Sequence, residues 1–266
     1  MSALLRNLLF PPRCIGCGEL LRVPDYRREA PYFCPACAEK WTREAAERCG
    51  ICGREVGDCT CVTEEMLAVH IATFRKLAYY RQGKREFVQN RMVYRIKEAR
   101  DRRTVGFFAD GLSRTVTELL RENGWRAADC ALVWLPRGSE KRRATGTDQA
   151  RELARGISAR TGIPAAGLIE RLPGEEREQK SLGTTERRRN ARSAFRLSER
   201  VCVPHSAHLF LVDDIVTTGS SMAAGVRLLR RAKYEAPVAL AALSDDVNRY
   251  THEKQPVIDL VKRKKP

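Results

Sequence analysis

The segment His208–Ser221, HLFLVDDIVTTGSS, decides the fold of this chain. Its apolar residues Leu209–Val212 predict a buried strand that ends at Asp213, and the apolar spacing of Met222–Ala232 predicts a helix directly after the segment. A loop between a strand and the start of a helix turns backbone N–H groups toward one point, where the helix dipole favours an anion. The sequence therefore predicts an anion site of the kind that holds a phosphate group.

Two acidic residues, Asp213 and Asp214, precede the loop residues, which are Thr217, Thr218, Gly219, Ser220 and Ser221. Carboxylates at this position can accept hydrogen bonds from vicinal hydroxyl groups or hold Mg²⁺ through water. Gly219 allows a ligand to approach the backbone closely because it has no side chain. A phosphate cradle beside two acids describes a site for a ribose 5-phosphate. The alternative is a plain strand end followed by an N-capped helix.

Cysteines are concentrated in the first part of the chain, where eight of the ten occur. They form three Cys-x-x-Cys pairs and one Cys-x-Cys pair, at Cys14, Cys17, Cys34, Cys37, Cys49, Cys52, Cys59 and Cys61. Both thiolates of such a pair can bind one tetrahedral metal ion, so eight ligands fit two zinc sites. The simplest assignment joins the first four cysteines at one site and the last four at the other, and interleaved assignments stay open. A disulfide framework or a redox pair is the alternative, but no secretion signal precedes the pairs.

After the cysteines, the chain alternates between expected strands and expected helices. The strands are expected at 131–135, 163–169, 208–212 and 238–243, and the helices at 104–123, 148–160 and 220–233. This alternation predicts an α/β fold with a mostly parallel sheet that is covered on both faces. Ligands bind such sheets at the carboxyl ends of the strands, where residues 136–138 and the 213–221 loop would lie. We expect a double zinc-ribbon module over 1–65, the sheet domain over 66–247 and a basic tail over 248–266.

The segment from Asp213 to Ser221 closely resembles the phosphoribosyl pyrophosphate (PRPP) signature of type I phosphoribosyltransferases, a strand ending in Asp-Asp before Thr-Thr-Gly-x-Ser/Thr. The resemblance implies that the two acids hold the ribose hydroxyls and that residues 217–221 bind the 5-phosphate. It also implies that PRPP binds together with Mg²⁺. A first loop, comprising Pro136, Arg137 and Gly138, would contact the pyrophosphate.

Three further segments are similar to the ComF competence-protein family. They are FPPRCIGCG at 10–18, WLPRGSEKRRATGTDQARELA at 134–154 and QKSLGTTERRRNARSAF at 179–195. The chain departs from the family pattern at the start of the first loop, which reads Trp-Leu-Pro-Arg, and at Thr147, where the family has an aromatic residue. Members of the family are associated with uptake of single-stranded DNA during natural transformation. The resemblance therefore implies partners in the competence machinery.

The net charge of +16 points to nucleic acid, phosphorylated ligands or acidic surfaces as partners. Residues 81–103 contain nine Lys or Arg and three acidic residues. We expect single-stranded DNA to bind there through Arg95, Arg100, Arg102 and Arg103. The segment 170–196 could close over the site as a lid through Lys180, Arg187, Arg188 and Asn190, or could be a solvated basic loop. No apolar run is long enough to span a membrane, so we expect a cytoplasmic protein.

Two functions from different classes fit these patterns. The first is a ComF-like protein that binds PRPP or ribose 5-phosphate with Mg²⁺ and serves DNA uptake, with single-stranded DNA as a partner. The alternative is an active phosphoribosyltransferase of nucleotide metabolism with an unassigned acceptor. The four histidines share no pattern that would identify a catalytic base. The sequence therefore favours binding of PRPP and leaves turnover open.

Overall fold

A parallel sheet of five strands forms the centre of the computed structural model, which describes residues 3–21, 30–99, 101–137, 146–172, 194–245 and 258–259. The strand order is β2-β8-β7-β3-β4, and every neighbouring pair is parallel. The strands are β2 (Thr73–Tyr80), β3 (Cys130–Trp134), β4 (Ala165–Ala166), β7 (His208–Val216) and β8 (Val238–Asp245). All eight residues of β8 are buried, as expected for an inner strand of a sheet covered on both faces. The expected α/β fold is confirmed.

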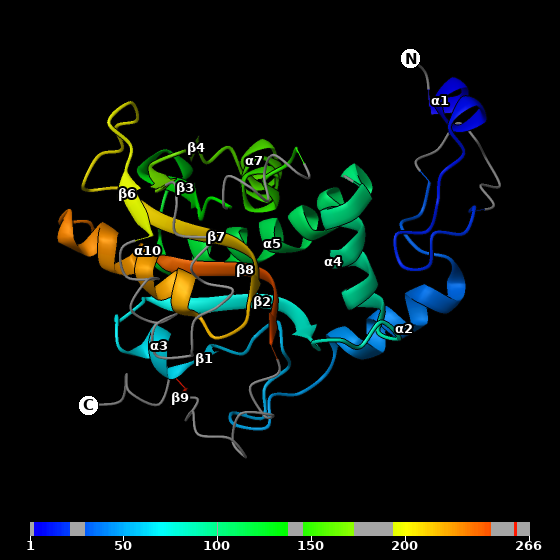
Figure 1. Cartoon of the computed structure of the whole chain (residues 1–266), viewed down its shortest axis with the longest axis horizontal. Coiled ribbons are helices and arrows are strands. Elements are labelled where there is room, and N and C mark those ends of the chain that lie inside the picture. Colours follow the sequence, from blue (N-terminus) through cyan, green and yellow to red (C-terminus); the bar gives the residue numbers. More distant parts are fainter. Residues whose placement is uncertain are drawn as a thin grey trace.

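Helices cover both faces of this sheet (Figure 1). One face carries α4 (Val88–Ala99), α5 (Arg102–Asn123) and α7 (Gln149–Thr161), and the other carries α3 (Glu64–Leu67) and α10 (Ser220–Arg231). Local signals fix the ends of α5, because the Asp101 side chain accepts hydrogen bonds from two N–H groups of its first turn and Gly124 ends it at φ 66°. α7 connects β3 to β4 on one face of the sheet, and α10 connects β7 to β8 on the other face. The chain therefore proceeds in opposite directions across the sheet from β3 and from its neighbour β7. Such a reversal is where open α/β sheets bind ligands.

The strand expected at 163–169 is wrong as a single element. The structure contains β4 and then β5 (Ile169–Arg171), which forms an antiparallel pair with β6 (Phe195–Leu197) outside the main sheet. β4 ends at Ala166, and a Cβ atom added to the next residue, Gly167, would lie 3.1 Å from the Trp134 ring. A residue with a side chain at this position would therefore crowd the ring at the end of β3, and the local apolar pattern does not reveal where β4 ends.

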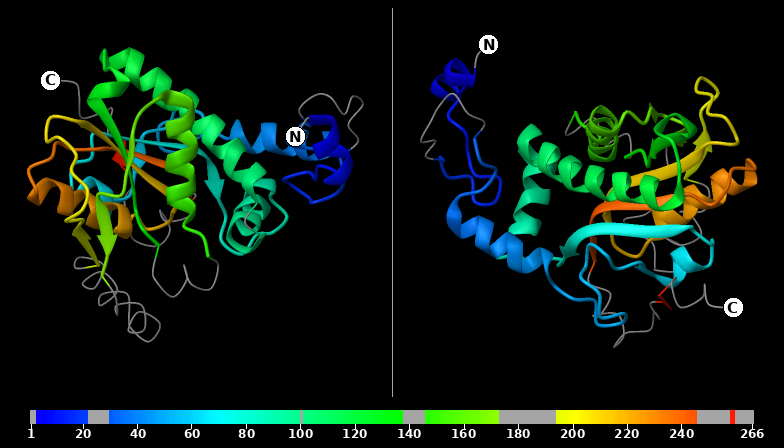
Figure 2. Two further views of the ribbon diagram at one scale, coloured as in Figure 1. Left: turned by 90° about the horizontal axis from the view of Figure 1, so that it is seen from above. Right: turned by 180° about the vertical axis from the view of Figure 1, so that it is seen from behind.

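The cysteine-rich part contains α1 (Ala3–Leu9), α2 (Pro35–Ala45) and β1 (Cys61–Val62). Its first portion stands at one end of the molecule, beyond α4, when seen from two further directions (Figure 2). It still shares a core with the α/β part, since Ile15 and Cys37 pack in one buried cluster with Val88 and Phe108. The buried Glu44 carboxylate on α2 also accepts hydrogen bonds from the first N–H groups of α4.

The division at residues 65 and 247 stays a prediction, and packing crosses both places. The α3 helix begins immediately before the first boundary and packs against α10. Within the expected tail, β9 (Ile258–Asp259) pairs antiparallel with β1, while the other tail residues lie outside the described residues. Among the described helices, none has the length and apolar character needed to cross a membrane.

Candidate functional site

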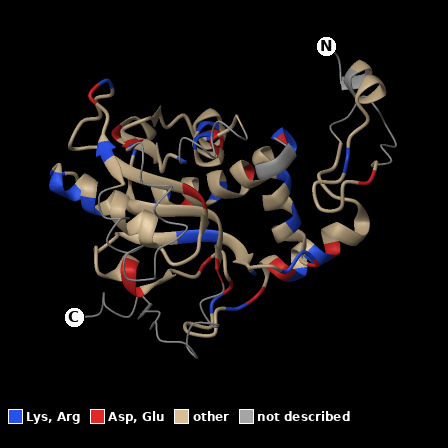
Figure 3. Ribbon diagram, viewed as in Figure 1, with Lys and Arg blue, Asp and Glu red and all other residues tan. Residues whose placement is uncertain are grey.

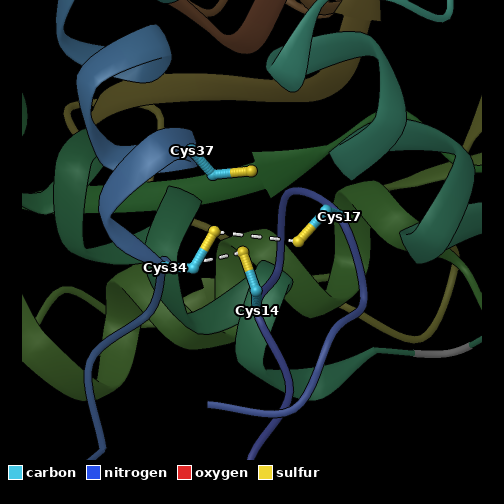
Figure 4. Close-up of side chains that lie close together, drawn as sticks. All are labelled: Cys14, Cys17, Cys34 and Cys37. Carbon is cyan, nitrogen blue, oxygen red and sulfur yellow. Dashed lines mark hydrogen bonds between the residues drawn. The ribbon is translucent and has the colours of Figure 1, made fainter. Parts of the chain in front are cut away.

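Four cysteines of the N-terminal portion bring their sulfur atoms together (Figure 4). The Sγ atoms of Cys14, Cys17, Cys34 and Cys37 all lie within 4.8 Å of one another. Cys14 begins a tight turn in which the Gly18 N–H donates to the Cys14 carbonyl at 2.8 Å, and Gly18 has φ 87°. Cys34 precedes α2 and Cys37 lies in its first turn. The turn at Cys14 and the start of α2 thus bring their four sulfur atoms around one point.

A second group contains Cys49, Cys52, Cys59 and Cys61, with the same spread of sulfur atoms. Its turn repeats the first, because the Gly53 N–H donates to the Cys49 carbonyl at 2.8 Å and Gly53 has φ 70°. The other two cysteines lead into β1. The structure therefore groups the eight cysteines as the simplest sequence assignment does, and no disulfide joins any of the ten cysteines.

The donor sets fit zinc. Four sulfur atoms arranged tetrahedrally at the ordinary Zn–S distance of about 2.3 Å lie roughly 3.8 Å apart. The Cys17 and Cys34 sulfur atoms are 3.8 Å apart. Burial would raise the pKa of the Cys14 thiol, but backbone N–H donors, including those of Cys34 and Gly16, lower it to about 7. The lowered pKa favours the thiolate, the metal-binding form, at Cys14, whereas burial raises the pKa of the Cys17 and Cys37 thiols in the same group.

A cation accompanies each group. The Lys76 side chain on β2 is 1% exposed, and its Nζ lies 3.3 Å from the Cys59 Sγ atom and 3.2 Å from the Cys59 carbonyl oxygen. At the first group, the Arg91 guanidinium on α4 lies 3.9 Å from the Cys37 Sγ atom. A buried ammonium group is costly unless an anion compensates it. A tetrathiolate zinc centre carries a net charge of about −2, so Lys76 has its counter-charge when zinc is bound.

Asp213 and Asp214, the two acids of the 213–221 loop, lie where β3 and β7 separate. The β3–β7 ladder ends at the Trp134–Val212 pair, whereas β7 continues beside β8 to the pair of Val216 with Ser244. The strand therefore extends past the expected end at Asp213 because β8 continues to pair with it. Both acids therefore lie on the part of β7 that extends beyond the end of β3, at the carboxyl ends of the strands.

The loop leads directly into α10. Gly219 precedes the helix with φ 80°, a conformation that favours glycine, and residues 213 and 215–222 line a cavity of about 50 Å³. One water molecule needs about 10–15 Å³ of such volume, so a group larger than water can enter. Thr217, Thr218 and Ser221 are exposed there, and the Thr218 and Ser220 hydroxyl oxygens are 3.1 Å apart. The first N–H groups of α10 have no partner within the helix and can bind an anion.

Burial raises the pKa of Asp213 well above its ordinary value, and the neighbouring Asp214 and Asp148 raise it further. Its Oδ1 atom accepts a hydrogen bond from the Asp214 N–H at 2.8 Å. Asp148 is buried at the start of α7, so the two loops bring three carboxyl groups near one another. Like-charge repulsion of this kind is relieved when a cation or hydroxyl donors approach the acids.

Asp148 also holds the first loop. Its Oδ2 atom accepts a hydrogen bond from the Arg137 N–H at 3.2 Å, and the Arg137 guanidinium donates to Gln149 Oε1 at 2.7 Å. Pro136 is buried beside them. Gly138 lies outside the described residues. The structure thus ties the described part of the first loop to the start of α7.

The expected lid residues Lys180, Arg187, Arg188 and Asn190 lie outside the described residues, as does Arg100. Two of the expected DNA-binding arginines have structural contacts. Arg95 pairs with Asp101 at 3.2 Å, and Arg103 donates to the carbonyl oxygens of Pro31 and Ala30. Arg102 is exposed. Arg103 on α5, and Arg91 on α4 through the Gly16 carbonyl, therefore hold the region of the first cysteine group, called the first ribbon below, against these helices.

Sequence reasoning missed Lys76 and Thr63. The Thr63 hydroxyl donates to the Thr218 carbonyl oxygen at 2.9 Å and thus contacts the 213–221 loop. The only signal at Lys76 is that a lysine occupies an inward position of an otherwise alternating strand. The Thr63 side chain caps the start of α3, because its oxygen accepts a hydrogen bond from the Met66 N–H. A threonine before a short helix predicts such a cap but not a second partner far away in the chain.

Comparison with known proteins adds one finding about the cysteine-rich part. Residues 5–68 match the family model of the double zinc ribbon domain. No curated protein matches the chain. The chain thus begins with a double zinc ribbon whose two four-cysteine groups are consistent with two zinc ions, and an α/β domain with a five-stranded parallel sheet follows.

Proposed function

We propose that the protein binds PRPP or ribose 5-phosphate together with Mg²⁺ at the loop of residues 213–221, as a ComF-like protein that acts in DNA uptake. The observation that carries this proposal is the position of Asp213 and Asp214 at the reversal point of the sheet, directly before a polar cavity at the start of α10. A sugar phosphate needs an anion cradle beside acceptors for its hydroxyls, and both are adjacent here.

Each part of the ligand has a partner among the described residues. The Thr218 and Ser220 hydroxyls and the first N–H groups of α10 would bind the 5-phosphate. Asp213 and Asp214 would accept hydrogen bonds from the ribose hydroxyls. Mg²⁺ supplies positive charge to the pyrophosphate group when it is bound. The described histidines lie elsewhere, since His208 starts β7 at its opposite end and stacks on Trp125, and this favours binding over turnover.

The first prediction concerns affinity for PRPP. In isothermal titration with PRPP and Mg²⁺, Asp214→Asn and Thr218→Ala should each weaken binding, because a hydrogen bond that involves a charged group contributes about 1.5–3 kcal/mol. The melting temperature should stay near that of the parent. Ser206→Ala, an exposed serine away from the loop, is the control. Parent-like affinity in both loop variants would assign the loop to a purely structural turn.

A second observation favours a contact with single-stranded DNA. A cavity of about 470 Å³ lies between the first ribbon and the start of α5, and its lining includes Phe10, Arg13, Tyr32, Arg102 and Arg103. Phe10 is 68% exposed. Basic residues also occur along α4 and toward the end of α10 (Figure 3). Exposed aromatic rings next to arginines are what single-stranded nucleic acids use for base stacking and phosphate contacts.

The second prediction tests this surface without disturbing the ribbon, so Arg95 and Arg103 are left in place. Arg102→Ala should flatten the slope of log affinity against log salt by about 0.7, the effect of one lost phosphate contact. Phe10→Ala should weaken binding by about 1–3 kcal/mol through a lost stacked base. The measurement is fluorescence anisotropy with an oligonucleotide of mixed sequence.

Matched controls are Arg126→Ala and Leu20→Ala, which remove an exposed arginine and an exposed apolar side chain outside the cavity lining. Both should bind DNA as the parent does. The surface assignment fails if the two pairs of variants behave alike. Complete displacement of DNA by saturating PRPP would instead place the nucleic acid in the sugar-phosphate site.

A further inference from the structure

The 213–221 loop, called the phosphate loop here, contacts the segment that follows the second cysteine group in the chain. Cys61 is the first residue of β1, and Thr63 comes two residues after it. The Thr63 side chain is 4% exposed and joins two partners, because its oxygen accepts from the Met66 N–H at 3.4 Å and its hydroxyl donates to the Thr218 carbonyl at 2.9 Å. One hydroxyl therefore connects the start of α3 with the centre of the loop.

The contact between the loop and α3 is close at the next residue as well. A Cβ atom added to Gly219 would lie 2.5 Å from the Thr63 Oγ1 atom and 2.6 Å from the Met66 Cγ atom, and Met66 is fully buried. Farther along the two helices, Arg230 on α10 donates to the Val69 carbonyl at 3.0 Å. The backbone at 218–219 thus has little freedom to move toward α3, and the position of α3 limits the shape of the loop.

The second cysteine group in turn determines where α3 begins. Two of its ligand residues, Cys59 and Cys61, lie in the segment that runs into Thr63. Lys76 donates hydrogen bonds from β2 to the carbonyl oxygens of both these residues, at 3.2 and 3.5 Å. A metal ion would bind this segment to the turn at Cys49 and Cys52. Without a metal ion, only contacts such as those of Lys76 would hold it in place.

We propose that metal bound at the second cysteine group positions the phosphate loop through Thr63, so that loss of this metal weakens binding of the sugar phosphate. The proposal rests on the proposed function of the loop. Thr63 is a positioning residue, because it contacts the loop backbone from the side of α3. The first cysteine group packs against α4 and α5 on the other face of the sheet, and no hydrogen bond among the described residues links it to the loop.

The third prediction removes the connecting hydroxyl while keeping the side-chain shape. Thr63→Val should weaken PRPP binding by about three- to tenfold, the range for one neutral hydrogen bond, with two zinc ions still bound. Thr63→Ser keeps the hydroxyl and should restore parent affinity. Thr161→Val is the matched control, because its hydroxyl bonds to the Ile157 carbonyl at the end of α7, away from the loop. A merely structural role for Thr63 would lower the melting temperature and leave the affinity unchanged.

Hydrogen exchange measures the same coupling without any ligand. Amides of residues 218–222 should exchange faster in Thr63→Val and in Cys59→Ser than in the parent, whereas Cys34→Ser should leave them unchanged. Amides of β8 serve as the internal reference for an intact sheet. If the β8 amides of Cys59→Ser also exchange faster, that variant has lost the sheet, and the exchange of residues 218–222 in Thr63→Val then tests the coupling.

The two ideas fail in different ways. A parent protein that binds no PRPP would overturn the proposed function of the loop, while the exchange measurement would still test the coupling. A parent that binds PRPP, with parent-like exchange and affinity in Thr63→Val, would overturn the coupling and leave the function standing. Equal loosening of the loop in Cys34→Ser and Cys59→Ser would also overturn it, because the effect would then not be specific to the second group.

Discussion

Purified protein should contain two zinc ions per chain, and Cys34→Ser should contain one. Four thiolates hold each ion, and the apparent binding free energy of a structural zinc site is about 10–16 kcal/mol in small zinc-binding peptides. The ion would hold the turn at Cys14 against the start of α2, so a lost thiolate should unfold the first ribbon. Elemental analysis gives the zinc content, and far-ultraviolet circular dichroism with thermal melting reports the folding.

The control for this fourth prediction is Cys202→Ser, since Cys202 is exposed and belongs to neither group. It should keep both ions and the parent melting curve. Protein that is folded, free of metal and cross-linked by disulfides would contradict the zinc assignment. Equal metal content in Cys34→Ser and the parent would show that the first group does not hold an ion through that sulfur atom.

The cysteine groups and the loop could be predicted from the sequence because both depend on local geometry. A Cys-x-x-Cys turn places two sulfur atoms together through its own backbone, as the bond from the Gly18 N–H to the Cys14 carbonyl shows. The loop at Asp213–Ser221 follows from a strand and a helix that adjoin it in the chain. The alternation of strands and helices predicts the parallel sheet for the same reason.

Contacts between distant residues could not be predicted in this way. Thr63 and Thr218 are 155 positions apart, and the sequence around either residue does not predict that they form a hydrogen bond. The chain folds β2 with a buried Lys76 in its centre, which breaks the apolar pattern of a strand. Its partner is a cysteine group in another part of the chain. Only the packed sheet brings the two together.

The basic tract illustrates a limit of counting charges along a sequence. Arg91, Arg95 and Arg103 share one tract, whose summed charge predicts contact with nucleic acid. Each instead has an acceptor or an acid contributed by the folded chain, and Arg91 donates to the Gly16 carbonyl at 3.0 Å. A linear charge count cannot distinguish arginines that fasten two parts of a protein from arginines that meet a ligand. Substitution of the whole tract would therefore mix unfolding with lost DNA contacts.

The fifth prediction concerns Lys76, whose replacement should destabilise the protein more than that of any exposed basic residue. Lys76→Met keeps the length of the side chain but removes the charge beside Cys59. Removal of one partner from a buried ionic pair costs about 3–5 kcal/mol, because the remaining charge has no compensation. Urea unfolding should show this loss. The second zinc ion should pass faster to a colorimetric chelator, while the first is released at the parent rate.

Arg75→Met is the matched control for this substitution. It removes the same charge from the adjacent position of β2, whose side chain points to the other face, is 18% exposed and donates to the Asp58 carbonyl at 3.0 Å. We expect a smaller loss of stability there and no change in zinc release, because the acidic partner Asp58 is 73% exposed and stays solvated by water after the substitution. Equal stability and equal zinc release in the two variants would mean that the ammonium group of Lys76 does not compensate the thiolates. A selective loss at the second site would instead identify this buried lysine as the counter-charge that allows four thiolates to lie against the sheet.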